Sequence, residues 1–362
     1  MNTFATLKTK RWFRIVFTFL KILLVLYIVW NLLVSFLTWP NYWDDKTIND
    51  ADLIPVMKEA VASELNAATY LPIQNDITDF EKSILTKKPE FKDKQFYIEG
   101  EIVSGARLQK FILDSQPLVA EFEKAATQSI YECPLSLNKY DVDTEFCQLG
   151  TLRSLATLIA FHTEFVLRNN NVSRAGKLTS TLLKVGHLIV EQKNPAAVIE
   201  HLVGMAIMGI ALDTIEAHPE LKKILTSQIL EYSVSDESSV RVLRANYLTS
   251  KNMILLGFTG EAETEKNIAN QGAYFLRPKE TVNNLAEFSR LNIKSILIPC
   301  NETSNSTIID ELMIKNKESS SLRNFYRPNI MGKILLATVL APLDSIRDRR
   351  CEINNRLTII AK

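Results

Sequence analysis

The longest apolar run of the chain lies near its start, from Ile15 to Trp39, and predicts a helix that crosses a membrane. A helix rises about 1.5 Å per residue, so a hydrocarbon core of roughly 30 Å needs about 20 apolar residues. Lys21 falls in the second turn, where its long side chain can carry the ammonium back to the head groups. Trp12 and Trp39 flank the run, as interfacial aromatic residues do. We therefore expect the chain to contact a lipid bilayer through residues 15–39.

The charges on the two sides of this run predict its orientation. The charged residues before the run are all basic: Lys8, Lys10, Arg11 and Arg14. The first acidic residues, Asp44 and Asp45, come after it. Basic flanks favour the cytoplasmic side, so the N-terminus is expected in the cytoplasm and residues 41–362 outside it. A cleaved signal peptide would have a shorter apolar core and a small-residue cleavage site, which the run lacks. The expected divisions are a basic tail (1–14), an anchor (15–39), a connector (40–55) and an exported domain (56–362).

Beyond the anchor, apolar residues recur mostly at helical spacing. Residues 56–71 predict a short amphipathic helix, and residues 106–131 predict helix with a new turn or helix at Pro117. From Leu152 onward, helices of about 20 residues alternate with short turns, which is typical of antiparallel αα-hairpins. No clean 34-residue repeat is present. The expected fold class is mainly α: a transmembrane helix, then packed αα-hairpins in a bundle or a solenoid-like array.

One segment, KQFYIEGEIVSG (94–105), is rich in β-prone residues around Gly100 and predicts a short β-hairpin or an extended stretch. The whole chain has only 11 glycines in 362 residues. Doubly wound nucleotide folds and β-rich folds use glycine at turns and phosphate loops. The scarcity of glycine therefore favours helices.

The charge balance argues against nucleic acid as a partner. The chain carries 42 basic and 41 acidic residues, and five of the basic ones belong to the anchor region. The exported part is therefore slightly acidic, at about −4, whereas phosphate binding needs a concentrated basic surface. A protein partner or self-association is expected instead.

Four cysteines occur, and all lie in the exported part: Cys133, Cys147, Cys300 and Cys351. In an oxidising compartment Cys133 and Cys147 pair most easily, because they bracket one polar loop. Closing a loop of about 15 residues contributes roughly 3 kcal/mol in the chain-entropy model. Buried free thiols are the alternative. No C-x-x-C spacing supports a redox motif or a zinc ribbon.

Histidine and carboxylate residues provide weak candidates for a metal site. His187 and Glu191 stand four apart on one expected helix, and Glu200-His201 opens the next. The H-E-x-x-H motif is absent, and single residues of these types on amphipathic helices are mostly surface or capping residues. His162 falls on an apolar stripe, which favours a hydrogen-bonded core histidine. We therefore predict no metal and no cofactor.

Other catalytic patterns are weak or missing. Asp141-Val-Asp143 spells the D-x-D motif of metal–nucleotide sites, but PLSLNKY before it is a poor strand. Phosphate loops, dinucleotide fingerprints and nucleophile elbows are absent from the sequence. Gly204 and Gly209, with Ala206 and Ala211, are expected to let another helix approach closely.

Near the C-terminus, a mixed-charge patch runs from Arg347 to Arg350 between apolar positions. Such a patch is usually a solvated helix face, and a ridge that binds a partner is the alternative.

The order of these segments resembles a known group of proteins. A basic-flanked anchor precedes the Leu-rich helices LRSLATLIAFHTEF, RAGKLTSTLLKVGHLIVEQ and IEHLVGMAIMGIALDTIE, and a closing helix begins N-x-x-G-K-[IL]-L. In this respect the chain resembles certain uncharacterised bacterial proteins with a single membrane anchor, over about half of its length. The resemblance implies a bacterial inner membrane, with the C-terminal domain in the periplasm. It implies no activity and assigns no functional residues.

Taken together, the sequence predicts an envelope scaffold or partner-binding protein that is more a binding module than an enzyme. The alternative is an envelope hydrolase or glycan transferase, which would need a deep polar pocket with clustered carboxylates or histidines.

Overall fold

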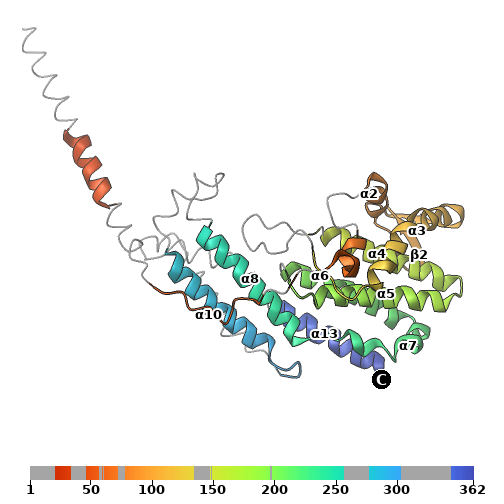
Figure 1. The fold of residues 1–362 in the computed structure, drawn as a ribbon. Helices are drawn as coiled ribbons and strands as arrows, with labels where there is room; N and C mark the ends of the chain where they lie inside the picture. The colour runs from red at the N-terminus through yellow and green to blue at the C-terminus, as the bar shows by residue number, and fades with distance from the viewer. Residues whose placement is uncertain are drawn as a thin grey trace, which may run out of the picture. The chain divides into compact units, whose positions relative to one another are not determined.

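In a computed structural model the chain is mainly helical, with one small sheet (Figure 1). The structure describes residues 21–33, 46–56, 59, 61–71, 78–133, 147, 149–195, 198–256, 277–302 and 344–362. Its longer helices are α3 (Gly105–Thr127), α4 (Leu149–Arg168), α5 (Val172–Val190), α6 (Val198–Ala217), α8 (Asp236–Leu256), α10 (Pro278–Ile296) and α13 (Asp344–Ala361). Its shorter ones are η1 (Ser63–Leu65), η2 (Ala67–Tyr70), α2 (Asp79–Leu85), α7 (Pro219–Leu225) and η3 (Ile229–Tyr232).

The chain forms two compact units. One comprises Met1–Ile48, Ile254–Asn284 and Leu312–Leu340, and the other comprises Asn49–Met253, Leu285–Glu311 and Ala341–Lys362. The second unit holds most of the described core and every site considered below.

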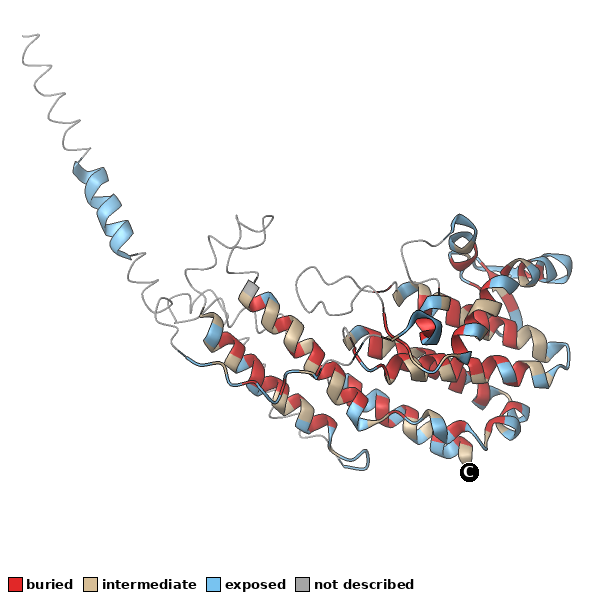
Figure 2. Ribbon diagram, viewed as in Figure 1, coloured by how far each residue is buried: buried red, intermediate tan, exposed pale blue. Residues whose placement is uncertain are grey.

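Within the first unit, the helix Lys21–Leu33 is apolar and every one of its residues is exposed (Figure 2). Its one amide side chain, Asn31, donates to the carbonyl of Tyr27 at 2.7 Å and so leaves fewer polar groups unpaired. This helix is the middle of the predicted anchor. Trp12, Arg14 and Trp39 lie outside the described residues.

Helices α5 and α6 share the most extensive helix–helix interface of the second unit. Two glycines face each other there: a Cβ on Gly186 would lie 2.9 Å from Gly204 O, and a Cβ on Gly204 would lie 2.9 Å from Gly186 O. A Cβ atom and a carbonyl oxygen do not approach this closely without a shift of the backbone, so glycine at both positions lets the two helices come this near. The expectation of a close approach was right for Gly204. It was wrong for Gly209, where a Cβ would meet nothing within 4 Å.

Among the described helices, α6 is long and apolar enough to cross a membrane, judged by length and composition. In its most apolar stretch of 18 residues, 56% of the residues are buried within the protein. The helix packs against α4, α5, α7 and α13. A helix that is hydrophobic on all sides is expected at the centre of a globular core as well as in a bilayer. Packing inside the domain accounts for the composition of α6.

Two local expectations were wrong. Pro117 lies inside the continuous helix α3 instead of starting a new one. Proline removes its own N–H and displaces the carbonyl four residues earlier, but that residue, Leu113, is 71% exposed, where water can solvate the carbonyl. Residues 61–71 form short 3-10 turns instead of an amphipathic helix.

The cause of the second difference is a long-range contact. The side-chain amide of Asn66 donates to Glu132 O at 2.8 Å and accepts from Glu132 N at 3.0 Å. These bonds, with the bridge between Asn66 and Ile130, attach the 61–71 segment to residues 130–132, which follow α3. Tertiary pairing therefore overrides the local helical pattern.

The sheet has three antiparallel strands in the order β1 (Glu90–Lys92), β2 (Gln95–Ile98) and β3 (Glu101–Val103). Both turns have two residues with positive φ, Asp93-Lys94 and Glu99-Gly100, as tight hairpin turns require. The expected hairpin over residues 94–105 corresponds to β2 and β3. Strand β1 was not expected from the sequence.

The end of the predicted connector is attached to α8 and α10. Asp50 accepts hydrogen bonds from Tyr247 Oη and Lys251 Nζ, each at 2.6 Å. Arg290 donates to both carboxylate oxygens of Asp52, at 2.9 and 2.6 Å. Leu53, the residue after Asp52, is 1% exposed. Residues 50–53 are therefore an integral part of the folded body.

The glycine pair provides a matched test of the core. We expect Gly204→Ala to destabilise the protein by about 1–3 kcal/mol, because the added methyl would overlap Val190 and the backbone of α5. Gly209→Ala, one helix turn away in open space, should instead be neutral or stabilising by about 0.5–1 kcal/mol, because alanine favours helix. Urea unfolding of the full chain in detergent measures both. Equal effects from the two substitutions would contradict this packing.

Candidate functional site

The second unit contains an open groove of about 660 Å³ between the sheet and two of the core helices. Its lining residues belong to strand β1 and Pro89 before it, to helices α4 and α6, and to His218, which follows α6. The lining residues are Pro89, Glu90, Phe91, Lys92, Thr157, Ala160, Phe161, Glu164, Ile210, Asp213, Thr214, Ala217 and His218. Its size is that of a site for a small molecule or a few residues of peptide.

Aromatic packing holds β1 against α4 and so fixes one wall of the groove. The ring of Phe96 on β2 packs against Phe91 at 5.0 Å and edge-on against Phe161 of α4 at 4.9 Å. The guanidinium of Arg168 stacks over both Phe91 and Phe96 at 4.8 Å and also donates to the carbonyl of Lys94 in the turn. Tilted and edge-on aromatic pairs and cation–π contacts of this kind stabilise the packing beyond the burial of apolar area.

His218 and Glu164 form the polar end of the groove, and a second carboxylate, Glu220, lies beside the histidine. His218 Nε2 lies 2.9 Å from Glu164 Oε1, and His218 Nδ1 lies 3.5 Å from Glu220 Oε1. Pro219 restricts His218 to an extended backbone conformation (φ −129°, ψ 94°), which ends α6 and turns the ring toward α4. A carboxylate–histidine pair of this geometry can bind a hydrogen-bonding ligand group or transfer a proton.

The C-terminal helix supports the same end of the groove. Arg356 of α13 donates to Asp213 at 2.6 Å and to both oxygens of Glu216, at 2.8 and 3.0 Å. Asp213 lines the groove, and Arg356 neutralises its carboxylate. Sequence reasoning missed Glu164, His218 and Arg356 because their partners are 54 or more positions away. The only local signal was the His218-Pro219 break after an apolar helix.

His162 is a hydrogen-bonded core histidine, as its position on an apolar stripe predicted. It is 2% exposed, and its Nε2 lies 2.7 Å from Ser115 Oγ on α3. Ser115 in turn donates to Phe111 O at 2.7 Å, so the imidazole N–H is the donor to the serine. Burial lowers the pKa of His162 to about 4, which keeps the ring neutral at physiological pH.

The other histidine–carboxylate pairs considered from the sequence are used in separate contacts. Glu191 accepts from Ser235 N and Oγ at 2.8 and 2.9 Å, whereas the ring of His187 packs edge-on against Tyr232. Glu200 accepts from Gln192 Nε2 at 3.0 Å, in the interior. Among the described residues, no three His, Cys, Asp or Glu side chains are grouped as metal ligands. Asp141 and Asp143 lie outside the described residues.

Two disulfides join parts of the second unit. Cys133 is bonded to Cys147, closing the loop that the sequence singled out, and Cys300 is bonded to Cys351, between the end of α10 and α13. The second bond was not assigned from the sequence, because its cysteines are 51 residues apart.

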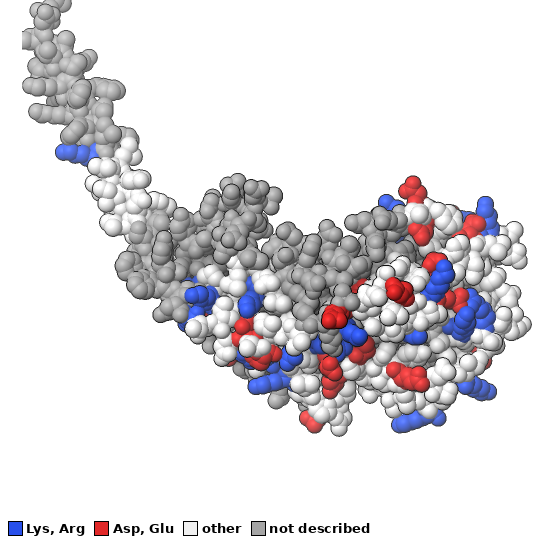
Figure 3. All heavy atoms as spheres, in the orientation of Figure 1, with Lys and Arg blue, Asp and Glu red and all other residues white. Residues whose placement is uncertain are grey.

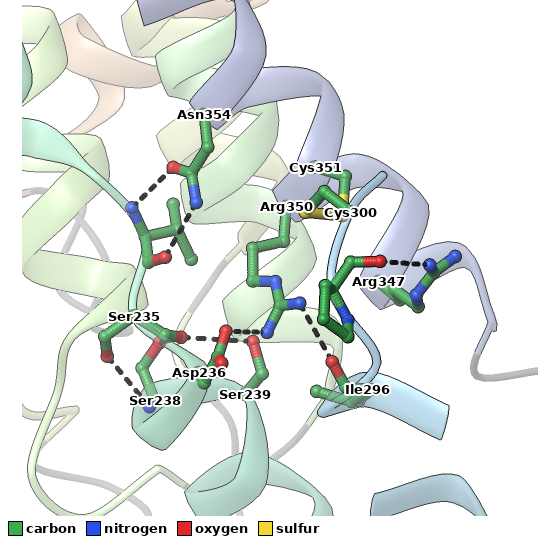
Figure 4. A network of polar contacts seen from close by, with 12 residues as sticks. Ser235, Asp236, Ser238, Ser239, Ile296, Cys300, Arg347, Arg350, Cys351 and Asn354 are labelled. Carbon is green, nitrogen blue, oxygen red and sulfur yellow. Dashed lines mark hydrogen bonds and ion pairs between the residues drawn. A yellow bond between two sulfur atoms is a disulfide. The ribbon is translucent and has the colours of Figure 1, made fainter. Parts of the chain in front are cut away.

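The charged patch 347–350 is not a solvated face, because two of its arginines are buried. Arg350 is 2% exposed; it pairs with Asp236 of α8 and donates to Ile296 O at 2.8 Å (Figure 4). Arg347, 6% exposed, donates to the carbonyls of Pro299 and Glu302 at 3.0 and 2.6 Å. The carbonyl of Ile296, the last residue of α10, is unpaired within the helix and attracts the guanidinium of Arg350, whereas Arg347 binds carbonyls of the segment that follows α10. Asp348 and Arg349 are the exposed members.

On the face shown in Figure 3, basic and acidic side chains of the described residues are interspersed. This face offers no concentrated basic surface of the kind that nucleic-acid phosphates need.

The depressed pKa of His162 predicts acid sensitivity. Between pH 6.5 and about 4 the unfolded chain binds a proton on this ring that the folded chain does not, so stability falls as pH falls. The loss over that range is about 3 kcal/mol. Urea unfolding across this pH range should therefore show a steeper loss for the wild type than for His162→Gln. Parallel curves for the two proteins would contradict a neutral buried imidazole.

No model of a known protein family, no protein of curated function and no solved structure matches this chain.

Proposed function

We propose that the chain is a single-pass protein of a bacterial inner membrane, with its N-terminus in the cytoplasm and its helical body in the periplasm. In this proposal the body is a scaffold that binds a protein partner. The exposed apolar helix Lys21–Leu33 supports the anchor, since an apolar surface on all sides is unfavourable in water. The two disulfides support an oxidising compartment, because such bonds rarely persist in the cytosol.

The observation that carries the binding role is the groove beside β1. It combines an apolar floor, formed by residues such as Phe161 and Ile210, with hydrogen-bonding groups at one end. Binding sites commonly have this composition. Its two threonine hydroxyls are already bonded to their own helices, Thr157 to Arg153 O at 3.1 Å and Thr214 to Ile210 O at 3.0 Å.

An envelope hydrolase or transferase remains the second candidate, because Glu164 and His218 form a hydrogen-bonded pair in the groove. Such a pair can act as a general base. The hydroxyls of Thr157 and Thr214 donate to helix carbonyls instead of to His218, so the pair lacks an activated nucleophile among the lining threonines. Incubation of the purified chain with cell-envelope glycan and peptide tests this candidate. A product formed by the wild type and lost in His218→Gln would favour it.

Photo-crosslinking from inside the groove tests the binding role. A photoreactive amino acid at position 157 should give a discrete adduct in growing cells, because Thr157 borders the groove and is only half-buried. The same amino acid at Lys110, an exposed position of α3 outside the lining, should give none. Adducts are read as shifted bands and by mass spectrometry.

Two results would count against the proposal. One is the absence of an adduct from position 157 in cells that express the chain. The other is an identical set of adducts from positions 157 and 110, since that would show contact with bulk neighbours instead of a bound partner.

A further inference from the structure

Within the part of the chain that the structure describes, strand β1 is an edge of the sheet, and its central residue has a pair of main-chain groups without a partner. Lys92 and Gln95 flank a two-residue turn, so they form the hydrogen-bonded pair next to it. Bonded and non-bonded pairs alternate along antiparallel strands, so the next pair, Phe91 and Phe96, is non-bonded. The N–H and C=O of Phe91 therefore point away from β2. No described residue forms a hydrogen bond with either group.

The groove runs along this open edge. Successive side chains of a strand point to opposite faces of the sheet, so a hollow on one face would be bordered only by alternate residues. Here the four consecutive residues 89–92 all border the groove. This pattern occurs when the hollow follows the edge of the strand itself, where the main-chain groups of Phe91 point.

The opposite wall offers a seat for an apolar side chain. Phe161 on α4 and Ile210 on α6 line the groove, with the small residues Ala160 and Ala217 beside them. The small side chains leave room, and the larger ones supply contact area. Glu164 and His218 lie at the polar end of the same wall, within reach of a polar neighbour of the seated residue.

We infer that this groove binds an extended segment of a polypeptide, which adds to β1 as a fourth strand and seats one apolar side chain against α4 and α6. This inference rests on the proposed binding function and names the kind of partner. Strand addition supplies a donor and an acceptor for Phe91, and the pocket for alternate side chains supplies selectivity. The three residues of β1 span about 10 Å, which matches a segment of about three residues.

A helical ligand fits the site less well. The main-chain groups of a helix are bonded within the helix, so it would leave the N–H and C=O of Phe91 unpaired while excluding water from them. Burying main-chain groups without partners is unfavourable. An unprotected edge strand is also the feature by which sheets recruit further strands.

Peptide display provides the probe for this inference. A library of random 12-residue peptides is selected on the full chain in detergent, and a selected peptide is synthesised with a single N-methyl group at each position in turn. Strand addition predicts one sensitive position: methylation of the peptide N–H that donates to Phe91 O removes that hydrogen bond and weakens binding at least 10-fold. Methylation at the two adjacent positions, whose N–H groups point away from β1, should have little effect.

Hydrogen exchange gives an independent readout on the protein itself. The amide of Phe91 should exchange freely without peptide and become protected with it. The amide of Lys92, already bonded to β2, is the internal control and should change little. Ala217→Trp, which fills the groove from an exposed position, should abolish binding, and Ala106→Trp on exposed α3 should not.

The outcomes separate this inference from the proposed function. A peptide that binds in the groove but is not weakened by methylation at any single position, or that leaves Phe91 unprotected, overturns strand addition and leaves the binding role intact. A library that yields no binder sensitive to Ala217→Trp also overturns it. Failure of the groove to crosslink in cells removes the binding role itself.

Discussion

The close approach of α5 and α6 determines where the walls of the groove lie. Because Gly186 and Gly204 let the two backbones meet, Met208 and Ile189 can interdigitate across the interface, each fully buried. Helix α6 then carries Ile210, Asp213 and the His218 that ends it to their places beside α4. A close-packed interior transmits small displacements, so a shift of α6 by the width of a methyl group would alter the groove directly.

The C-terminal helix α13 depends on charge as much as on apolar packing. Arg350 binds the carbonyl of Ile296 at the end of α10, and Arg347 binds carbonyls of the segment that follows this helix. Arg356 binds two carboxylates of α6, and the bond from Cys300 to Cys351 joins the segment after α10 to α13 covalently. A buried arginine whose partner is lost is costly, so these contacts make the position of α13 specific. The disulfide adds stability by restricting the unfolded chain, and it depends on an oxidising environment.

Much of the helical pattern could be predicted from the sequence, because amphipathic spacing reports burial directly. The stripes through Leu155, Leu182 and Met205 correspond to buried faces of α4, α5 and α6. Long-range polar contacts could not be predicted. Asn66 binds the main chain of Glu132, so the segment around it is not helical although its apolar spacing is. Arg350 is buried although its neighbours in sequence are charged. The site was missed for the same reason, since β1 is only three residues long and Glu164 meets His218 across 54 positions. Sequence spacing alone carries no signal for such pairs.

In the proposed function, the anchor holds a disulfide-closed body on the far side of the membrane. Thiol labelling in intact cells tests it most directly. A membrane-permeant maleimide that adds visible mass should modify none of the four cysteines before reduction and all four after it. A reporter fused after Lys362 that is active only outside the cytosol should be active in the same cells. Free thiols in freshly lysed cells, together with a reporter active only in the cytosol, would contradict the account.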